Sequence, residues 1–234
     1  MPRILRTVLL PILLCASAIS AHATQIAVFG SPANGLKNFN DTVAAANGSA
    51  THDKWENLSG GYSFDRGNYT VTRNNGGYLA PETYGDLSGQ VVSIDPVDDG
   101  DGGKGSGVTL SFKSAVNAIG FEVGDWGTCC LPSALYISFD GGQAIRVGLS
   151  EQPGDVEFDG KDEVFVGAFD DAGSFTTVQF WGDGFGEYLL FGGTVHYALI
   201  DEGSLEVPEP ASMALVGLGL AAAGLARRRK AVKG

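Results

Sequence analysis

Histidine and cysteine, which often serve as general base, reactive nucleophile or zinc ligand, are few in this sequence. After the first 23 residues the chain holds two histidines, His52 and His196, and two cysteines, Cys129 and Cys130. A catalytic triad needs Ser, His and Asp to converge, and zinc needs Cys and His at set spacings; neither motif is present. We therefore expect a protein without enzymatic activity. Two carboxylates suffice for a glycosidase, so a carbohydrate-active hydrolase stays open as the alternative.

The two cysteines are adjacent, which excludes an ordinary disulfide between them. Neighbouring Cα atoms lie about 3.8 Å apart, whereas disulfides favour about 4.4–6.8 Å. Three states stay open for Cys129 and Cys130: a strained vicinal disulfide, two thiols, or bridges to other molecules. In all three states the pair does not cross-link distant parts of the fold.

Four carboxylates fall within seven residues of a glycine-rich loop: Asp95, Asp98, Asp99 and Asp101. Calcium takes six to eight oxygen ligands, which acidic turns supply. The EF-hand spacing fails, because reading from Asp99 puts Gly103 where a side-chain oxygen is needed. A second acidic stretch runs from Glu151 to Glu163. A structural Ca²⁺ in one of these loops is the single cofactor hypothesis, and a solvated turn is the alternative.

Two tryptophans lie close to an aspartate in glycine-rich segments. Asp125 precedes Trp126, and Trp181 is followed by Asp183. Ligand sites combine apolar contact with a few placed polar groups, so these four residues are candidate contacts for a sugar. The alternative is that both indole rings fill the core, where large aromatics bury much area.

The elements that would position these residues read as short strands. Glycine is abundant, with 35 residues in the chain, and no long amphipathic helix is apparent. The strand-like runs are rich in β-branched and aromatic residues and end at Gly, Asn, Asp or Pro: Gln25–Phe29, Tyr69–Arg73, Gln90–Ile94, Val108–Phe112, Ala118–Val123, Leu135–Phe139, Ala144–Leu149, Glu163–Ala168, Phe175–Trp181, Tyr188–Phe191 and Thr194–Ile200.

Many short strands with frequent turns predict an all-β sandwich. The Asp140-Gly141 turn between Leu135–Phe139 and Ala144–Leu149 predicts a hairpin. One helix-permissive segment, Phe39–Ala46, stands near the start.

The first 23 residues have the layout of a secretory signal peptide. Arg3 and Arg6 precede an apolar run from Val8 to Ile19, and Ala21-His22-Ala23 matches the A-x-A cleavage pattern. The run is shorter than the roughly 20 residues of a transmembrane helix, so we expect removal of 1–23 and export of the rest.

The exported body, residues 24–206, is strongly acidic. The two ends of the chain hold seven of the 15 basic residues and one of the 27 acidic residues, which leaves 8 basic and 26 acidic residues in the body. This balance repels nucleic acid, whose binding requires Lys and Arg to neutralise phosphates. Nucleic acid is therefore excluded as a partner.

The end of the chain, residues 207–234, predicts a provisional membrane anchor. Ala211–Ala226 is apolar and would be about 24 Å long as a helix, against a hydrocarbon core of about 30 Å. Arg227, Arg228 and Arg229 would stay on the cytoplasmic side. Pro208 and Pro210 keep the preceding peptide extended and open to a protease. An ordinary tail anchor is the alternative.

Pro208-Glu209-Pro210, the short apolar helix and the arginine cluster resemble the PEP-CTERM sorting signal of Gram-negative bacteria. The resemblance implies processing by exosortase, a membrane-embedded transpeptidase similar to cysteine proteases, and a link to exopolysaccharide and biofilm. It makes Pro208, Glu209 and Pro210 the recognition motif and Arg227, Arg228 and Arg229 the stop signal. The protein would pass through an inner-membrane-tethered stage before reaching the outer surface or matrix.

A second resemblance covers part of the body. Phe112–Phe121, followed by Asp125, is similar to a stretch common in PEP-CTERM ectodomains. Ser138–Gly142 and Phe175–Phe180 stand where those domains have a Gly-Gly turn and a later strand. The resemblance implies a jelly-roll sandwich of the lectin or galactose-binding type. Tyr188–Val195 departs from the acidic strand expected there, so a site built on those acids is not carried over.

The sequence thus predicts an exported, non-catalytic β-sandwich at the envelope or in the extracellular matrix, with exosortase and exopolysaccharide as partners. Besides the hydrolase, a matrix building block assembled through Cys129 or Cys130 stays open.

Overall fold

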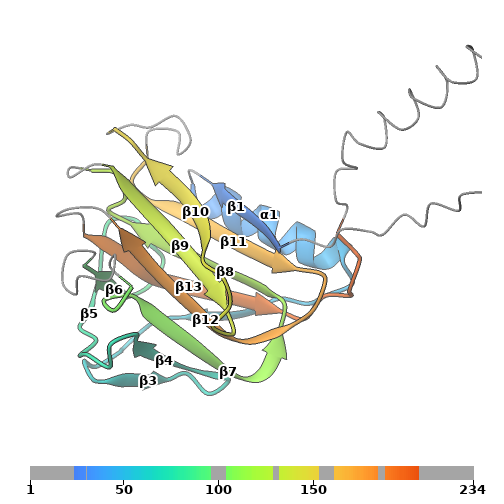
Figure 1. The fold of residues 1–234 in the computed structure, drawn as a ribbon, viewed down its shortest axis with the longest axis horizontal. Coiled ribbons are helices and arrows are strands. Elements are labelled where there is room, and N and C mark those ends of the chain that lie inside the picture. The colour runs from blue at the N-terminus through green and yellow to red at the C-terminus, as the bar shows by residue number, and fades with distance from the viewer. Residues whose placement is uncertain are drawn as a thin grey trace, which may run out of the picture.

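The computed structural model describes residues 24–29, 31–95, 104–128, 132–152, 161–183 and 188–205. Two antiparallel sheets pack face to face, with one helix outside them (Figure 1). The predicted all-β sandwich is confirmed. The signal peptide and the sorting segment lie outside the described residues, and within the described ranges no helix is long and apolar enough to span a bilayer.

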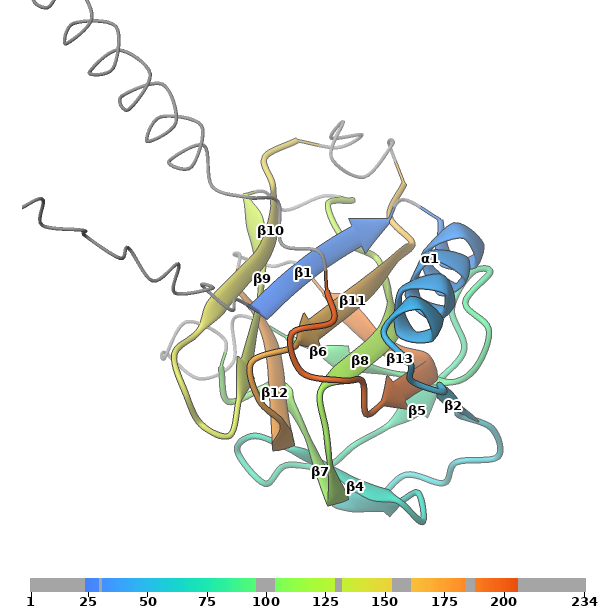
Figure 2. The same ribbon diagram turned by 90° about the vertical axis from the view of Figure 1, so that its right-hand side faces the viewer.

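One sheet has seven strands, and a helix covers its outer side. Its order is β1 (Thr24–Phe29), β11 (Val164–Asp170), β8 (Ala118–Gly124), β13 (Leu189–Ala198), β6 (Val91–Ile94) and β5 (Pro81–Glu82), with β2 (Thr51–Lys54) paired to β13 off this path. Figure 2 shows α1 (Pro32–Ala45) along the outer side of this sheet, next to β1 and β11. Because both faces are covered, β8 is buried along its whole length.

The other sheet has six strands and one solvated face. Its order is β10 (Ile145–Ser150), β9 (Ser133–Phe139), β12 (Phe175–Asp183), β7 (Val108–Val116), β4 (Tyr69–Arg73) and β3 (Ser63–Asp65). Along β7, Leu110 and Phe112 are buried, whereas Ser111 and Lys113 are exposed. This alternation is typical of an antiparallel sheet with one face on the core and the other in water.

Aromatic rings from both sheets meet in the core. Phe121 of β8 lies 4.7 Å from Phe180 of β12, measured between ring centroids, and 4.7 Å from Phe191 of β13. A second cluster under α1 includes Phe39, Phe165 and Phe169. The strand-like runs therefore supply one central core between the sheets and a smaller one beneath the helix.

The helix begins earlier than the sequence predicted. Phe39–Ala46 was expected, and α1 runs from Pro32 to Ala45. Proline is tolerated in the first helical turn, where its missing N–H has no partner to lose. Gly35 lets the helix lie close to the sheet, because a Cβ there would lie 2.3 Å from Cβ of Phe165.

The predicted hairpin is confirmed as β9 and β10, which pair antiparallel. Asp140 and Gly141 in its turn have φ values of 49° and 70°. Both residues thus adopt the left-handed conformation that a tight hairpin turn requires.

Tyr188–Phe191 and Thr194–Ile200, expected as separate strands, are one strand, β13. Gly192 and Gly193 between them form an irregularity rather than a turn, with φ values of 143° and 67°. The ladder between β13 and β8 changes register there. Trp55 occupies the space beside this bulge, since a Cβ on Gly192 would lie 2.7 Å from its ring.

Candidate functional site

The Asp125-Trp126 pair forms part of a structural turn. Trp126 is 1% exposed, and its indole N–H donates to the carbonyl of Ser133 at 3.2 Å. Asp125 has a φ of 60°, and its Oδ1 accepts hydrogen bonds from Tyr84 at 3.1 Å and Thr128 at 2.9 Å. The burial of Trp126 leaves no ring face at the surface for a sugar, which removes it from the candidate site.

Trp181 lies on the solvated face of the six-stranded sheet, in a row with residues of two neighbouring strands. It pairs across strands with Tyr136 of β9, which pairs in turn with Arg146 of β10. Directly opposed residues project from the same face. The rings of Trp181 and Tyr136 are stacked, with 5.7 Å between centroids and 20° between planes. Trp181 is 6% exposed, whereas Tyr136 is half-buried, so Tyr136 presents the accessible ring.

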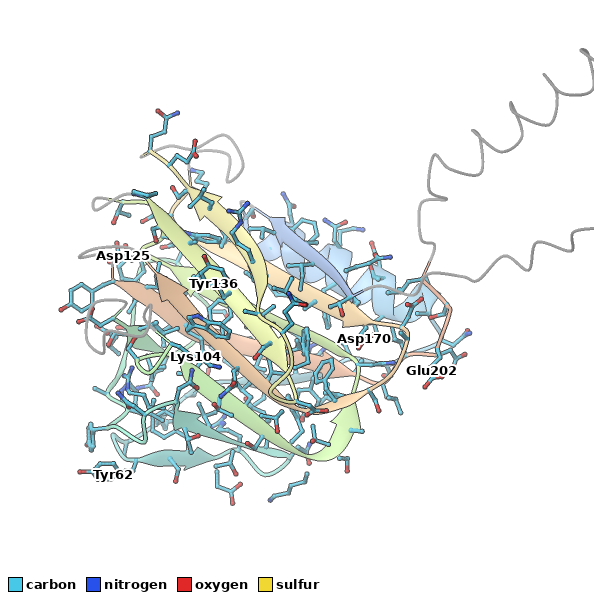
Figure 3. All side chains as sticks on the ribbon, in the orientation of Figure 1. Tyr62, Lys104, Asp125, Tyr136, Asp170 and Glu202 are labelled. Atoms are coloured by element: carbon cyan, nitrogen blue, oxygen red, sulfur yellow. The ribbon has the colours of Figure 1, made fainter. Side chains whose placement is uncertain are left out.

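A lysine completes this row at its other end. Nζ of Lys104, in the turn before β7, lies over the indole ring of Trp181, 5.2 Å from the centroid. A cation over an indole face is attracted by the ring quadrupole. Figure 3 shows Tyr136 and Lys104 close together on the face of the sheet formed by β9 and β12. We call Arg146, Tyr136, Trp181 and Lys104 the aromatic row.

A strip of hydrogen-bonding side chains runs beside the aromatic row, two residues further along the strands. Ser138, Gln179 and Thr109 oppose one another on β9, β12 and β7. Their mutual hydrogen bonds are long, 3.5 Å from Ser138 to Gln179 and 3.4 Å from Gln179 to Thr109. Thr109 also donates to Asn74 at 2.6 Å. This polar strip supplies hydroxyl and amide groups next to an aromatic surface, the combination that ligand sites use.

Sequence reasoning singled out Trp181 and missed its three partners. The sequence could have paired Arg146 with Tyr136, because a tight Asp-Gly turn fixes which residues oppose each other in the hairpin. The contact of Lys104 with Trp181 could not be predicted from the sequence, since it depends on how β7 and β12 pair. Asp183 ends β12 opposite Ala134, and its side chain lies outside the described part.

The other predicted site residues are placed only in part. Asp95 directly follows β6, whereas Asp98, Asp99 and Asp101, both cysteines, Pro208 to Pro210 and Arg227 to Arg229 lie outside the described residues. Within the described ranges, no group of three or more His, Cys, Asp and Glu side chains is arranged to hold a metal ion. The structural Ca²⁺ and the state of the cysteine pair stay predictions.

A cavity of about 390 Å³ opens elsewhere, between the chain at 54–57 and the 83–90 loop. Ser88 in its wall donates two hydrogen bonds to Glu122 of β8, from the backbone at 2.7 Å and from the hydroxyl at 2.6 Å. Burial raises the pKa of Glu122, which is 5% exposed, above its ordinary value. A glycosidase acid must reach the glycosidic oxygen. The oxygens of Glu122 are instead engaged in holding the 83–90 loop on the sheet.

The last described residues, 200–205, form a stem that is fixed to the body. Asn117, 1% exposed, accepts from the backbone N–H of Ile200 at 2.7 Å and donates to its carbonyl at 2.9 Å. Asp171 accepts from the backbone of Leu205 at 3.2 Å. Glu202 in this stem and Tyr62 lie at opposite ends of the molecule in Figure 3. The aromatic row lies on a side of the body, away from the stem.

Comparisons with known proteins give one match in sequence and distant likenesses in fold. No curated protein matches the chain. A mutant of the family 29 carbohydrate binding module CBM29-2 has 15% identity and a TM-score of 0.36, over 68% of this chain and 99% of that one. A family 29 module from Piromyces equi also has 15% identity and a TM-score of 0.36, over 65% and 93%.

The sequence match falls on the tail. The family model described as the PEP-CTERM protein-sorting motif matches residues 206–230. These residues contain the Pro-Glu-Pro motif, the apolar segment and the arginine cluster, so the predicted resemblance is confirmed there. The motif implies a protein that is exported and then processed by exosortase at the membrane. The chain therefore carries a PEP-CTERM protein-sorting motif at residues 206–230.

Proposed function

We propose that the body is a non-catalytic glycan-binding module, delivered to the cell envelope or extracellular matrix of a Gram-negative bacterium by its sorting tail. It associates there with exopolysaccharide of the biofilm. The lectin-like jelly-roll class belongs to the same proposal.

The observation that carries the proposal is the stacked pair of Tyr136 and Trp181 on a solvated sheet face. Large rings normally face the core, where their burial is favourable. Here they project from the outer side, beside the polar strip. The aliphatic face of a sugar ring can lie on Tyr136 while its hydroxyl groups bond to Gln179 and Thr109. Cross-strand pairing holds both rings in place, so little ordering entropy is lost on binding.

Substitution of Tyr136 by alanine tests this placement. We expect at least a tenfold loss of affinity for the bound glycan, about 1.4 kcal/mol, with the fold retained. Affinity electrophoresis against a panel that includes the host exopolysaccharide would measure it. Tyr62→Ala is the matched control, because Tyr62 is a 70% exposed tyrosine far from the aromatic row in Figure 3. Equal binding by wild type and Tyr136→Ala would overturn the site, and release of reducing sugar would favour the hydrolase instead.

Processing of the tail is tested independently of the ligand. In a host with its exosortase, the mature protein is expected to lack the arginines 227–229 and the apolar segment before them. Deletion of the exosortase should leave the full tail and keep the protein in the membrane fraction. Mass spectrometry of the C-terminal peptide from both strains distinguishes the two forms. A mature protein that still carries Arg229 in the wild-type strain would contradict the sorting proposal.

A further inference from the structure

Basic side chains are scarce in the body, and the structure shows what most of them contact. Four ion pairs with carboxylates account for half of the eight: Lys37 with Asp41, Lys54 with Glu56, Arg66 with Asp53, and Lys113 with Asp65. Arg73 donates to the backbone carbonyls of Tyr78 and Ser106. Lys104, Arg146 and Lys161 remain, with no carboxylate partner among the described residues.

Two of these three cations stand in the aromatic row. Arg146 is exposed and directly opposes Tyr136, and Lys104 lies over Trp181. Arg146 and Trp181 are two strands apart, which corresponds to roughly 10 Å at a strand spacing of about 4.8 Å. The two charges therefore bracket the stacked rings, over a distance that a short oligosaccharide covers.

The position of two cations beside the stacked rings bears on the charge of the ligand, because the protein as a whole is acidic. A chain with a formal net charge of −12 repels a polyanion, unless the contact surface itself is positive. A neutral sugar gains little from a cation, whereas an acidic sugar forms charge-assisted hydrogen bonds with guanidinium and ammonium groups. Cations that have no carboxylate partner within the described part of the chain, placed at both ends of an aromatic surface, are therefore complementary to a sugar chain with negative groups along it.

We infer that the ligand of the aromatic row is an acidic polysaccharide, with carboxylate groups held by Arg146 and Lys104 and a sugar ring on Tyr136. This inference rests on the proposed glycan-binding function and adds the chemical class of the glycan. Arginine can hold a carboxylate with two parallel hydrogen bonds, whereas lysine acts as a point charge. The arginine end is thus the more selective of the two.

Polygalacturonate and its methyl ester are suitable probes, because they share a backbone and differ in charge. With protein expressed from the full-length sequence, we expect wild type to bind the acid form at least about tenfold more tightly than the ester at low salt. The preference should shrink as salt shortens the Debye length from about 30 Å at 0.01 M to about 3 Å at 1 M.

Variants separate the inference from the proposed function. The double substitution Lys104→Gln with Arg146→Gln should weaken binding of the acid form by about tenfold and change binding of the ester less than twofold. Lys37→Gln with Lys161→Gln, which removes the same charge elsewhere, should leave both unchanged.

Equal binding of acid and ester, both lost in Tyr136→Ala, would overturn the acidic ligand and leave the glycan-binding function standing. Acid binding that falls equally in both double variants and is unchanged in Tyr136→Ala would show diffuse charge attraction, which overturns the inference and the site together. Failure to bind any glycan of the panel would overturn the proposed function itself.

Discussion

Replacement of Asp53 by alanine is expected to lower the free energy of unfolding by about 3 kcal/mol, because it removes the central acceptor of a network between the two sheets. Arg66 forms two hydrogen bonds to this carboxylate, at 2.9 and 2.6 Å. The hydroxyl of Tyr69 donates to the same carboxylate at 2.6 Å and accepts from the indole N–H of Trp55 at 2.8 Å. Asp53 belongs to β2 and Tyr69 to β4, so the network connects the sheets.

Burial decides the size of this effect. Exposed ion pairs contribute about 0–1 kcal/mol, whereas removal of one partner from a buried pair costs about 3–5 kcal/mol. The side chains of Asp53 and Arg66 are 19% and 17% exposed, and Tyr69 is fully buried. Hydrogen bonding to Asp53 raises the pKa of Arg66, and burial raises that of Tyr69. Both donors would lose their acceptor in Asp53→Ala, which places the loss near the lower end of the buried range.

Urea unfolding of wild type and Asp53→Ala measures the difference as a shift of the midpoint at constant m. Asp41→Ala is the matched control, because it removes an exposed carboxylate that pairs with Lys37 on α1. This control should change the free energy of unfolding by less than about 0.5 kcal/mol. A loss in Asp53→Ala no larger than in Asp41→Ala would show that the network does not join the sheets energetically.

Local signals in the sequence were sufficient for most strands, and non-local pairing was needed for the site. The β9–β10 hairpin was predicted because its turn and both strands are contiguous. Tyr136 and Trp181 are brought together by pairing of β9 with β12, and the segment between them contains strands of both sheets. A period-two pattern assigns residues to a face of a strand but does not choose the neighbouring strand.

The two tryptophans show why local motifs did not separate core from surface. Trp126 follows β8, whose sheet is covered on both sides, and is buried among core residues. Trp181 lies in β12, next to the buried Phe180, and projects from the opposite face. Both stand near Gly and Asp in the sequence. Their environments differ because α1 covers one sheet and leaves the other solvated, which the sequence motifs do not encode.

The short polar strands and the bulge in β13 could also not be predicted from local sequence patterns. β2, β3 and β5 hold four, three and two residues, most of them polar or exposed. Their strand geometry comes from pairing with β13, β4 and β6 rather than from propensity. Gly192-Gly193 resembles a turn signal, and becomes a bulge because Trp55 fills the space beside it.

The free energy of unfolding is expected to fall by about 3 kcal/mol between pH 7 and pH 4 because of His196 alone. This residue is 2% exposed, and its ring packs beside Phe39 and Phe165 under α1, with centroids 6.0 and 5.7 Å away. Its Nδ1 lies 2.6 Å from Nδ1 of His52. Burial first, and the charge of His52 second, lower the pKa of His196 to about 4.

The loss of stability at low pH follows from the different proton binding of the unfolded and the folded protein. In the unfolded chain His196 takes up a proton near its ordinary pKa of 6.5, whereas in the folded protein it stays neutral until about pH 4. The unfolded state therefore binds more protons in this window and gains stability as the pH falls. At 1.36 kcal/mol per pKa unit the loss is about 3 kcal/mol. Nε2 of His196 has no hydrogen-bond partner within the described structure, so nothing there stabilises the added charge.

His196→Phe isolates this contribution, because phenylalanine suits the apolar surroundings and does not titrate. For each protein, the difference in unfolding free energy between pH 7 and pH 4 is measured, and the two differences are then compared. The first subtraction removes the cost of the lost contact to His52. The second removes the contribution of the carboxylates that both proteins share. This difference should be about 3 kcal/mol smaller in the variant. An NMR titration offers a direct check, since the ring protons of His196 should not shift until the pH approaches 4. A midpoint near 6.5, or equal pH dependence in both proteins, would mean that water reaches this ring and that α1 does not seal it from solvent.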